Sequence, residues 1–229
     1  MSTSKGAPSR AQRSLLLWIA DVGPVTAAAL ATMQATTVSS ARARLAAAVR
    51  VGFATCWRPL AGEPAIYTLT RTGLRRCGLP AAEAVRVSPA NAAHLIACAH
   101  VAAQLACRYP DNVVLGERAL RRLERQAGGV LASATLGHGP GGDALLHRPD
   151  LVLWPIEGTS LPVAVEVELT IKAPRRLVQI CRAWARCRDV AGVLYLAAPS
   201  VELSLGRAIA GADAVDAVVA LPLGVLGAH

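Results

Sequence analysis

The sequence predicts a two-domain α+β or α/β protein, in which a small helical domain with a β-hairpin precedes a larger domain built on a mixed β-sheet. Three observations lead to this prediction. Positive charge is concentrated in the first third of the chain, helix and hairpin patterns fill that same third, and strands interleaved with helices fill the second half. The chain has 229 residues, of which 53% are hydrophobic, so it has enough apolar material for one large core or two small ones.

The charge distribution separates the two domains. Residues 1 to 80 carry ten Lys or Arg against two Asp or Glu, whereas the rest of the chain carries fourteen against thirteen. Nearly all of the net charge of +9 therefore lies in the first third. A domain that binds a polyanion concentrates its charge in this way, whereas a protein that is merely basic spreads it. Residues 1 to 10 are predicted to be a flexible basic tail, and residues 11 to 80 the first domain.

The first domain is predicted to contain three helices followed by a hairpin. The helices are expected at residues 11 to 21, 25 to 33 and 40 to 51. Pro24 suits the first turn of the second helix, Thr37 or Ser39 can cap the third, and Gly52 can end it. Two strand-like runs, joined by a turn at residues 61 to 64, are expected at residues 53 to 60 and 65 to 70.

Three helices with a hairpin resemble the winged helix-turn-helix, and the run Tyr67-Thr68-Leu69-Thr70-Arg71-Thr72-Gly73-Leu74 resembles the "Y-x-L-T-x-x-G" ending common in that class. The resemblance implies that the third helix enters the major groove of double-stranded DNA. The arginines that it implies as DNA contacts are Arg42, Arg44, Arg50, Arg58 and Arg71. The alternative is that these arginines form a solvated face on a domain that binds protein.

Residues 81 to 112 are predicted to connect the domains through a helix at residues 89 to 108, apolar on most sides, which packs between the domains or against a second copy. The second domain, residues 113 to 229, is expected to begin with a helix at residues 113 to 126. Its strands are expected at residues 130 to 136, 145 to 154, 162 to 170, 192 to 198 and 214 to 221, with further helices at residues 174 to 188 and 201 to 210. The glycine-rich residues 137 to 142 are predicted to join two strands, because they lack the Gly-Lys-Ser/Thr ending of a phosphate loop.

Carboxylates interrupt two apolar strands of the second domain. Glu166 and Glu168 alternate with Val165 and Val167, so both acids are expected on one face of the sheet. Like charges about 7 Å apart on a half-buried sheet are costly unless a cation neutralises them. Asp150 can approach Glu166 because the link between the two strands makes them antiparallel. The pattern predicts a site for Mg²⁺ or Mn²⁺ that serves phosphodiester hydrolysis.

These residues resemble the motifs of the PD-(D/E)xK nuclease superfamily, with Pro149-Asp150 as "PD" and Glu166-Val167-Glu168 in the "ExK" region. Combined with the winged helix, the pattern "RPD...AVEVEL...K" resembles more narrowly the replication-relaxation family of plasmid and mobile-element proteins. The resemblance implies that Asp150 and Glu166 bind the metal. Glu168 stands where the superfamily expects lysine, and Lys172 can reach the same site.

Glu117, on the helix before the sheet, matches a position where many superfamily members supply a further metal-binding acid. The alternative is an ordinary surface glutamate paired with Arg121 at four-residue spacing. Arg175, Arg176, Arg182 and Arg186 are candidates to line the path of the DNA, although their spacing is not expected to place all four on one stripe. On the same helix Gln179 is a candidate substrate contact and Trp184 a core residue.

The expected function is therefore that of a plasmid or mobile-element protein that binds DNA and nicks or hydrolyses it with a Mg²⁺-dependent domain. One alternative is a non-catalytic regulator whose second domain serves dimerisation. Another is an accessory factor that recruits replication or conjugation proteins. A homodimer is expected, because a symmetric site on duplex DNA favours binding by a two-fold symmetric dimer.

The cysteines, the histidines and the apolar runs mainly argue against particular features, namely a zinc site and a membrane span. The six cysteines contain no Cys-x-x-Cys pair and the histidines lack zinc-site spacing, so reduced thiols are expected and a zinc site is not. Polar residues interrupt both long apolar runs, at Asn91, His94 and His100 and at Asp213 and Asp216. No membrane span and no cleaved leader are therefore predicted, and the cytoplasm is the expected location.

Overall fold

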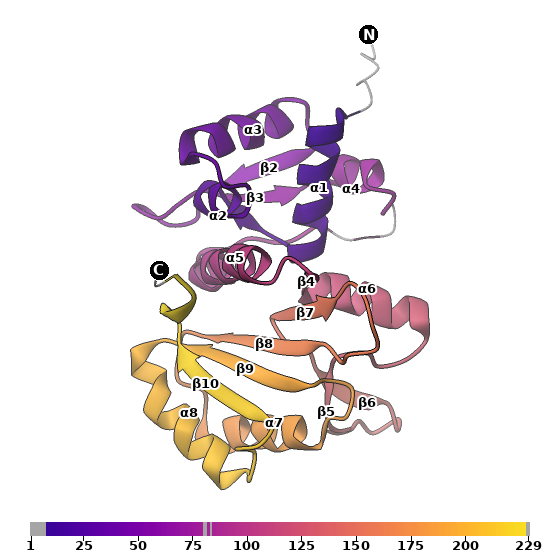
Figure 1. Ribbon diagram of the computed structural model, residues 1–229, viewed down its shortest axis with the longest axis vertical. Helices are drawn as coiled ribbons and strands as arrows, with labels where there is room; N and C mark the ends of the chain where they lie inside the picture. Colours follow the sequence, from indigo (N-terminus) through magenta and orange to yellow (C-terminus); the bar gives the residue numbers. More distant parts are fainter. Residues whose placement is uncertain (1–7, 80–81, 83, 228–229) are drawn as a thin grey trace. The chain divides into compact units, whose positions relative to one another are not determined.

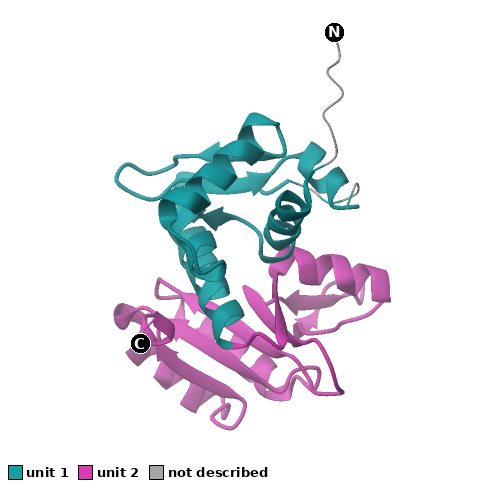
Figure 2. Cartoon of the chain, turned by 45° about the horizontal axis from the view of Figure 1, so that its top comes forward, with its two compact units in different colours: residues 1–108 teal, residues 109–229 magenta. Residues whose placement is uncertain are grey.

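The computed structural model describes residues 8 to 79, 82 and 84 to 227. Most of the predicted basic tail, residues 1 to 7, lies outside the described residues. The chain forms two compact units, residues 1–108 and 109–229 (Figure 2). Both combine helices with strands, so the predicted α+β class is confirmed at that level. Each unit is described below by itself.

Unit 1 contains five helices and a small sheet among its described residues (Figure 1). Its elements are α1 (Arg10–Val22), β1 (Val25–Thr26), α2 (Ala27–Met33), α3 (Val38–Arg50), β2 (Ala54–Trp57), β3 (Ile66–Leu69), α4 (Arg71–Arg76) and α5 (Pro89–Arg108). The strands are ordered β1-β3-β2, and both neighbouring pairs are antiparallel, which confirms the predicted hairpin. The second helix was predicted to begin at Val25, and this is wrong, because Val25 and Thr26 pair with β3 as a strand. Thr26 then caps α2 by accepting a hydrogen bond from the Ala29 amide.

The threonine and the glycine of the "Y-x-L-T-x-x-G" run have identifiable structural tasks. Thr70 caps α4 by accepting a hydrogen bond from the Gly73 amide, and its hydroxyl donates to the Gly52 carbonyl over 2.7 Å. A Cβ added at Gly73 would lie 2.1 Å from the carbonyl oxygen of Phe53. The motif thus fastens the start of α4 against the residue that precedes β2. The helix α4 itself was not predicted as a separate element.

Helix α5 has the bounds expected from the sequence and packs on α2 within unit 1. Ala99 and Ala103 contact Ala29 there. Among the described residues, α5 is the one helix long and apolar enough for a membrane span, with a mean hydropathy of 1.2. The core helices of soluble proteins meet the same criterion. The prediction that Asn91, His94 and His100 exclude this helix as a candidate membrane span is therefore wrong by the criterion of length and hydropathy.

Unit 2 is built on a five-stranded sheet with the order β10-β9-β8-β7-β4, together with a separate hairpin of β5 and β6 (Figure 1). Its elements are β4 (Asn112–Gly116), α6 (Glu117–Ala127), β5 (Ala134–His138), β6 (Ala144–His147), β7 (Leu151–Pro155), β8 (Val163–Glu168), α7 (Pro174–Arg186), β9 (Gly192–Ala197), α8 (Pro199–Gly211), β10 (Val218–Pro222) and a 3₁₀ turn at Val225–Gly227. The strands β8, β9 and β10 are parallel, whereas β4, β7 and β8 are antiparallel to one another in turn.

Several predicted elements of unit 2 are wrong in their bounds. The strands expected from residues 130 and 214 begin instead at Ala134 and Val218. The helix expected from residue 113 begins at Glu117, because Asn112–Gly116 pairs with β7 as an edge strand. The single strand expected over residues 145 to 154 is two strands, β6 and β7, which belong to different sheets. Pro149 lies at the break, where its missing N–H prevents a continuous ladder. The predicted antiparallel neighbours are confirmed, since Leu151 of β7 lies opposite Val165 of β8.

The core of unit 2 lies between the sheet and the helices α7 and α8. Ala164 of β8 and Tyr195 of β9 face this core, where Leu177 and Trp184 of α7 and Leu205 of α8 are fully buried. Because side chains alternate along β8, Glu166 and Glu168 share the face of Ala164. Both acids consequently point toward the helical layer.

Candidate acidic site in unit 2

Three carboxylates from neighbouring strand segments come together in unit 2. Glu166 and Glu168 on β8 are each 4% exposed. Asp150 directly precedes β7, and its Oδ2 accepts a hydrogen bond of 2.8 Å from the Val167 amide. The charge of Asp150 raises the pKa of Glu166, which places the two carboxylates within electrostatic reach of each other. The structure thus brings together the three acids that the sequence singled out.

Glu166 is held by two side chains that the sequence did not indicate. Its Oε1 lies 2.7 Å from Nε2 of His147 at the end of β6. It also accepts a hydrogen bond of 3.2 Å from Nε1 of Trp184 on α7. The rings of His147 and Trp184 meet edge to face, with centroids 5.8 Å apart. Burial raises the pKa of Glu166, and the contact with His147 opposes that rise.

Glu168 is paired with Lys172, whose Nζ donates to its Oε2. The sequence suggested that Lys172 can reach the site although it stands four residues beyond Glu168, and the structure places it there. Its positive charge also lowers the pKa of Glu166. The lysine side chain is 38% exposed, whereas the glutamate is 5% exposed. The Lys172 side chain therefore lies between the buried Glu168 and the solvent.

Glu117 lies at the surface, where its Oε1 forms an ion pair of 2.5 Å with Nη2 of Arg121. This is the arrangement expected of an ordinary surface glutamate. The buried acid of α6 is instead Glu124, which accepts hydrogen bonds from Nε of Arg148 over 2.8 Å and from Oγ of Ser133 over 2.5 Å. A sequence signal existed, since Glu124 falls four residues after Leu120 on the apolar stripe of α6.

The groups around the acids stay neutral. Burial and the charge of Glu166 raise the pKa of the Cys181 thiol to about 11. The same two causes raise the pKa of the Tyr195 phenol, which lies opposite Glu166 in the register of β8 and β9. The contact with His147 and the charge of Lys172 both oppose the raised pKa of Glu166. The three carboxylates form a set of hard oxygen donors, which fits a divalent cation such as Mg²⁺.

The predicted DNA contacts of unit 1 are all exposed, namely Arg42, Arg44, Arg50, Arg58 and Arg71. Arg44 donates to Oε1 of Gln34 over 2.5 Å. Arg42 of α3 and Arg58, after β2, both lower the pKa of Tyr67, so cations from the third helix and from the hairpin lie near the same phenol. Burial is the larger effect and raises the pKa of Tyr67. Their roles in DNA binding stay predictions.

All six cysteines are free thiols, as expected, although Cys107 is exposed. Comparison of the chain with family models, with curated proteins and with solved structures gave no match. The resemblance to the PD-(D/E)xK superfamily and to the replication-relaxation family therefore depends on the residues quoted above and on the geometry of the two units.

Proposed function

We propose that this chain binds double-stranded DNA through unit 1 and hydrolyses or nicks DNA phosphodiesters with a Mg²⁺- or Mn²⁺-dependent site in unit 2. The observation that carries the proposal is the burial of Glu166 and Glu168 beside Asp150 on one face of the sheet. Buried carboxylates are costly, and a site that places two of them beside the half-buried Asp150 gains most from a divalent cation.

The order of elements in unit 1 supports the DNA-binding part. Three helices, with β1 between the first two, precede the hairpin of β2 and β3, as in a winged helix-turn-helix. The exposed arginines Arg42 and Arg44 stand on α3, which would be the recognition helix. Residues 1 to 108 hold twelve Lys or Arg against three Asp or Glu, whereas residues 109 to 229 hold twelve against twelve. The whole net charge thus belongs to the unit proposed to bind the polyanion.

The order of elements in unit 2 supports the nuclease part. Helix α6 precedes the strand segments that bear the acids, and α7 and β9 follow them. Asp150 stands at the start of β7 and Glu166 on the adjacent β8, which corresponds to the "PD" and "ExK" positions. The narrower likeness, to plasmid and mobile-element proteins, extends the proposal to a role in the cytoplasmic processing of such DNA.

Each side chain of the site has a definite task in this proposal. Asp150 and Glu166 would hold the metal ion, which when bound polarises the scissile phosphate and lowers the pKa of a water molecule. His147 and Trp184 fix the orientation of Glu166 through its Oε1. Lys172, which is tethered to Glu168, is placed to orient the attacking water or the phosphate.

The test is the nicking of supercoiled plasmid by the purified full chain with Mg²⁺ or Mn²⁺, with EDTA as a control. Asp150→Asn and Glu166→Gln should abolish nicking, whereas Glu202→Gln, which neutralises an exposed acid on α8, should nick like the wild type. Nicking that survives in both site variants would contradict the proposed site. An intact plasmid with every protein would contradict the nuclease function itself.

One observation favours a second candidate, a non-catalytic DNA-binding regulator or a replication or conjugation accessory factor. His147 contacts Glu166 and Lys172 pairs with Glu168, so each of these acids already has a basic partner, which is how a scaffold without metal would stabilise them. In that case unit 2 would serve dimerisation or partner binding. A protein that shifts duplex DNA in a gel but leaves plasmid intact would favour this candidate.

A further inference from the structure

Helix α7 has two chemically distinct faces. Its inner face buries Leu177, Cys181 and Trp184, and Trp184 contacts Glu166 of the acidic site. The outer face carries the residues Arg175, Gln179, Arg182 and Arg186, all exposed. These four follow one another at intervals of four, three and four residues, which is the spacing of a single helix face.

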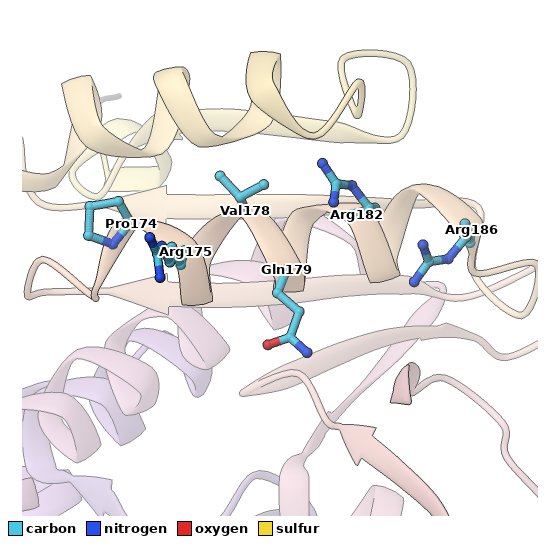
Figure 3. A pocket seen from close by; sticks show the side chains of 6 residues that line it. All are labelled: Pro174, Arg175, Val178, Gln179, Arg182 and Arg186. Atoms are coloured by element: carbon cyan, nitrogen blue, oxygen red, sulfur yellow. The ribbon is translucent and has the colours of Figure 1, made fainter. Parts of the chain in front are cut away.

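The stripe agrees with the expectation that the four arginines would not share one face. Three of the four arginines considered there lie on one face, with Gln179 between them, while Arg176 lies beside the stripe and donates to Oε1 of Gln179 over 3.0 Å. Together with Pro174 and Val178, the residues of the stripe line an open groove of 580 Å³ (Figure 3). No acidic side chain lines it among the residues that the structure describes. We call this surface the arginine groove.

The cations of the arginine groove have no carboxylate partner within the described part of the chain. Arg182 donates to the Gly211 carbonyl over 3.4 Å, and no ion pair involves Arg175, Arg182 or Arg186. Three like charges on one helix face repel one another. An anionic ligand would relieve this repulsion, whereas a neutral or cationic partner would not.

We propose that the arginine groove binds the phosphate backbone of nucleic acid, as a second contact besides unit 1. From Arg175 to Arg186 the helix rises about 16 Å, which spans several phosphates of a DNA strand. Guanidinium groups match phosphate oxygens through two parallel hydrogen bonds, and the Gln179 amide adds a further donor. The contact is independent of sequence, because it reaches phosphates and not bases.

The position of the groove defines its role. It lies on the side of α7 opposite Trp184, so a strand bound there does not occupy the acidic site. The groove acts as an anchor on unit 2 that holds DNA away from the reacting phosphate. This inference rests on the proposed function for the choice of ligand, but it predicts binding whether or not the acids catalyse hydrolysis.

The test measures binding of the full chain to a labelled duplex of unrelated sequence, by fluorescence anisotropy in EDTA over a series of salt concentrations. The groove variant is Arg175→Gln/Arg182→Gln/Arg186→Gln. A matched control removes the same charge from exposed arginines of unit 2 that do not line the groove, as Arg118→Gln/Arg125→Gln/Arg207→Gln. A double variant, Arg175→Gln/Arg186→Gln, keeps the Arg182 contact with Gly211 in case the triple variant folds poorly.

The groove variant should weaken binding roughly tenfold or more and lower the slope of log affinity against log salt by about 2 to 3, since each lost phosphate contact removes about 0.9. The control should keep the wild-type slope. Equal slopes in the groove variant and the control would overturn the inference, and so would a wild type that binds no DNA. The same variants are also tested for binding to vesicles of anionic phospholipid. A groove variant that loses vesicle binding but keeps the wild-type affinity for DNA would overturn the inference in favour of a lipid surface. A weakened groove variant of a protein that nicks no plasmid would support the anchor and remove only the nuclease proposal.

Discussion

The two units differ in where their charged side chains lie, at the surface in unit 1 and partly in the interior in unit 2. Among the described residues, the buried polar side chains of unit 1 are two threonines, Thr26 and Thr68, whereas those of unit 2 are three glutamates and a serine. Unit 1 keeps its arginines at the surface and its interior neutral. Unit 2 balances its total charge but takes acids into its interior. Exposed cations act through an electrostatic field that salt screens, whereas buried acids depend on specific neighbouring side chains. Substitutions of charged residues should therefore weaken binding in unit 1 and lower stability in unit 2.

The two buried threonines of unit 1 are hydrogen-bonded to neighbouring side chains, whereas the indole N–H of Trp18 in the same unit is buried without a hydrogen-bond partner in the part of the chain that the structure describes. Oγ1 of Thr68 accepts a hydrogen bond of 3.0 Å from Nε1 of Trp57, and Oγ1 of Thr26 lies 3.2 Å from Nε2 of His100. In unit 2 each buried glutamate is paired with a basic side chain, which is Arg148 for Glu124, His147 for Glu166 and Lys172 for Glu168. Unit 2 is therefore the unit in which the loss of one partner is most damaging.

The largest expected effect is the loss of a partner from a buried acid. Arg148→Ala leaves Glu124 buried without its cation and should lower the free energy of unfolding by about 3–5 kcal/mol. Urea denaturation followed by circular dichroism measures this change. Arg121→Ala removes the partner of the exposed Glu117 and should cost less than about 1 kcal/mol. Similar losses in the two variants would break the comparison between buried and surface charge.

A steric effect in unit 1 should come next. Gly73→Ala places a methyl group against the carbonyl of Phe53 and should lower stability by about 1–3 kcal/mol, because the backbone must move. Gly206→Ala on α8 of unit 2 meets nothing within 4 Å. It should stabilise the protein by about 0.5–1 kcal/mol through helix propensity. Thermal unfolding compares the two, and a neutral Gly73→Ala would show that the motif glycine is not needed for packing.

The surface charge of unit 1 should affect binding and leave stability unchanged. Arg42→Gln/Arg44→Gln/Arg58→Gln should weaken duplex binding roughly tenfold near physiological salt and flatten its salt dependence. Anisotropy titrations measure both quantities. Asp150→Asn provides the contrast, because it should leave binding in EDTA intact. If the arginine variant instead lost stability and kept its affinity, the division of tasks between the units would be wrong.

The smallest effect should be a pH dependence that arises from His100. Burial lowers the pKa of His100 below its ordinary value, so the unfolded chain binds the proton more readily than the folded one. Stability should therefore fall as the pH drops from about 7.5 through the ordinary histidine pKa of about 6.5. His100→Gln should reduce this slope in urea denaturation. An unchanged slope in the variant would assign the pH dependence to other groups.

The sequence predicted what depends on short-range patterns. Alternation placed Glu166 and Glu168 on one face, and the long, largely apolar run from Pro89 to Arg108 predicted α5. Partners that come from distant elements were missed. His147 and Trp184 meet at Glu166 only because β6 ends beside β8 and α7 covers the sheet, and no local spacing encodes that meeting. The strand Asn112–Gly116 was missed because it continues directly into α6 at Gly116, so residues 113 to 126 were predicted as one helix.

Calorimetric titration of Mg²⁺ or Mn²⁺ into the full chain tests directly whether the acids of unit 2 hold a divalent cation. The wild type and Glu202→Gln should bind the ion alike, while Asp150→Asn and Glu166→Gln should each lose that binding. Equal binding by all four proteins, or binding by none of them, would contradict a cation site at these acids.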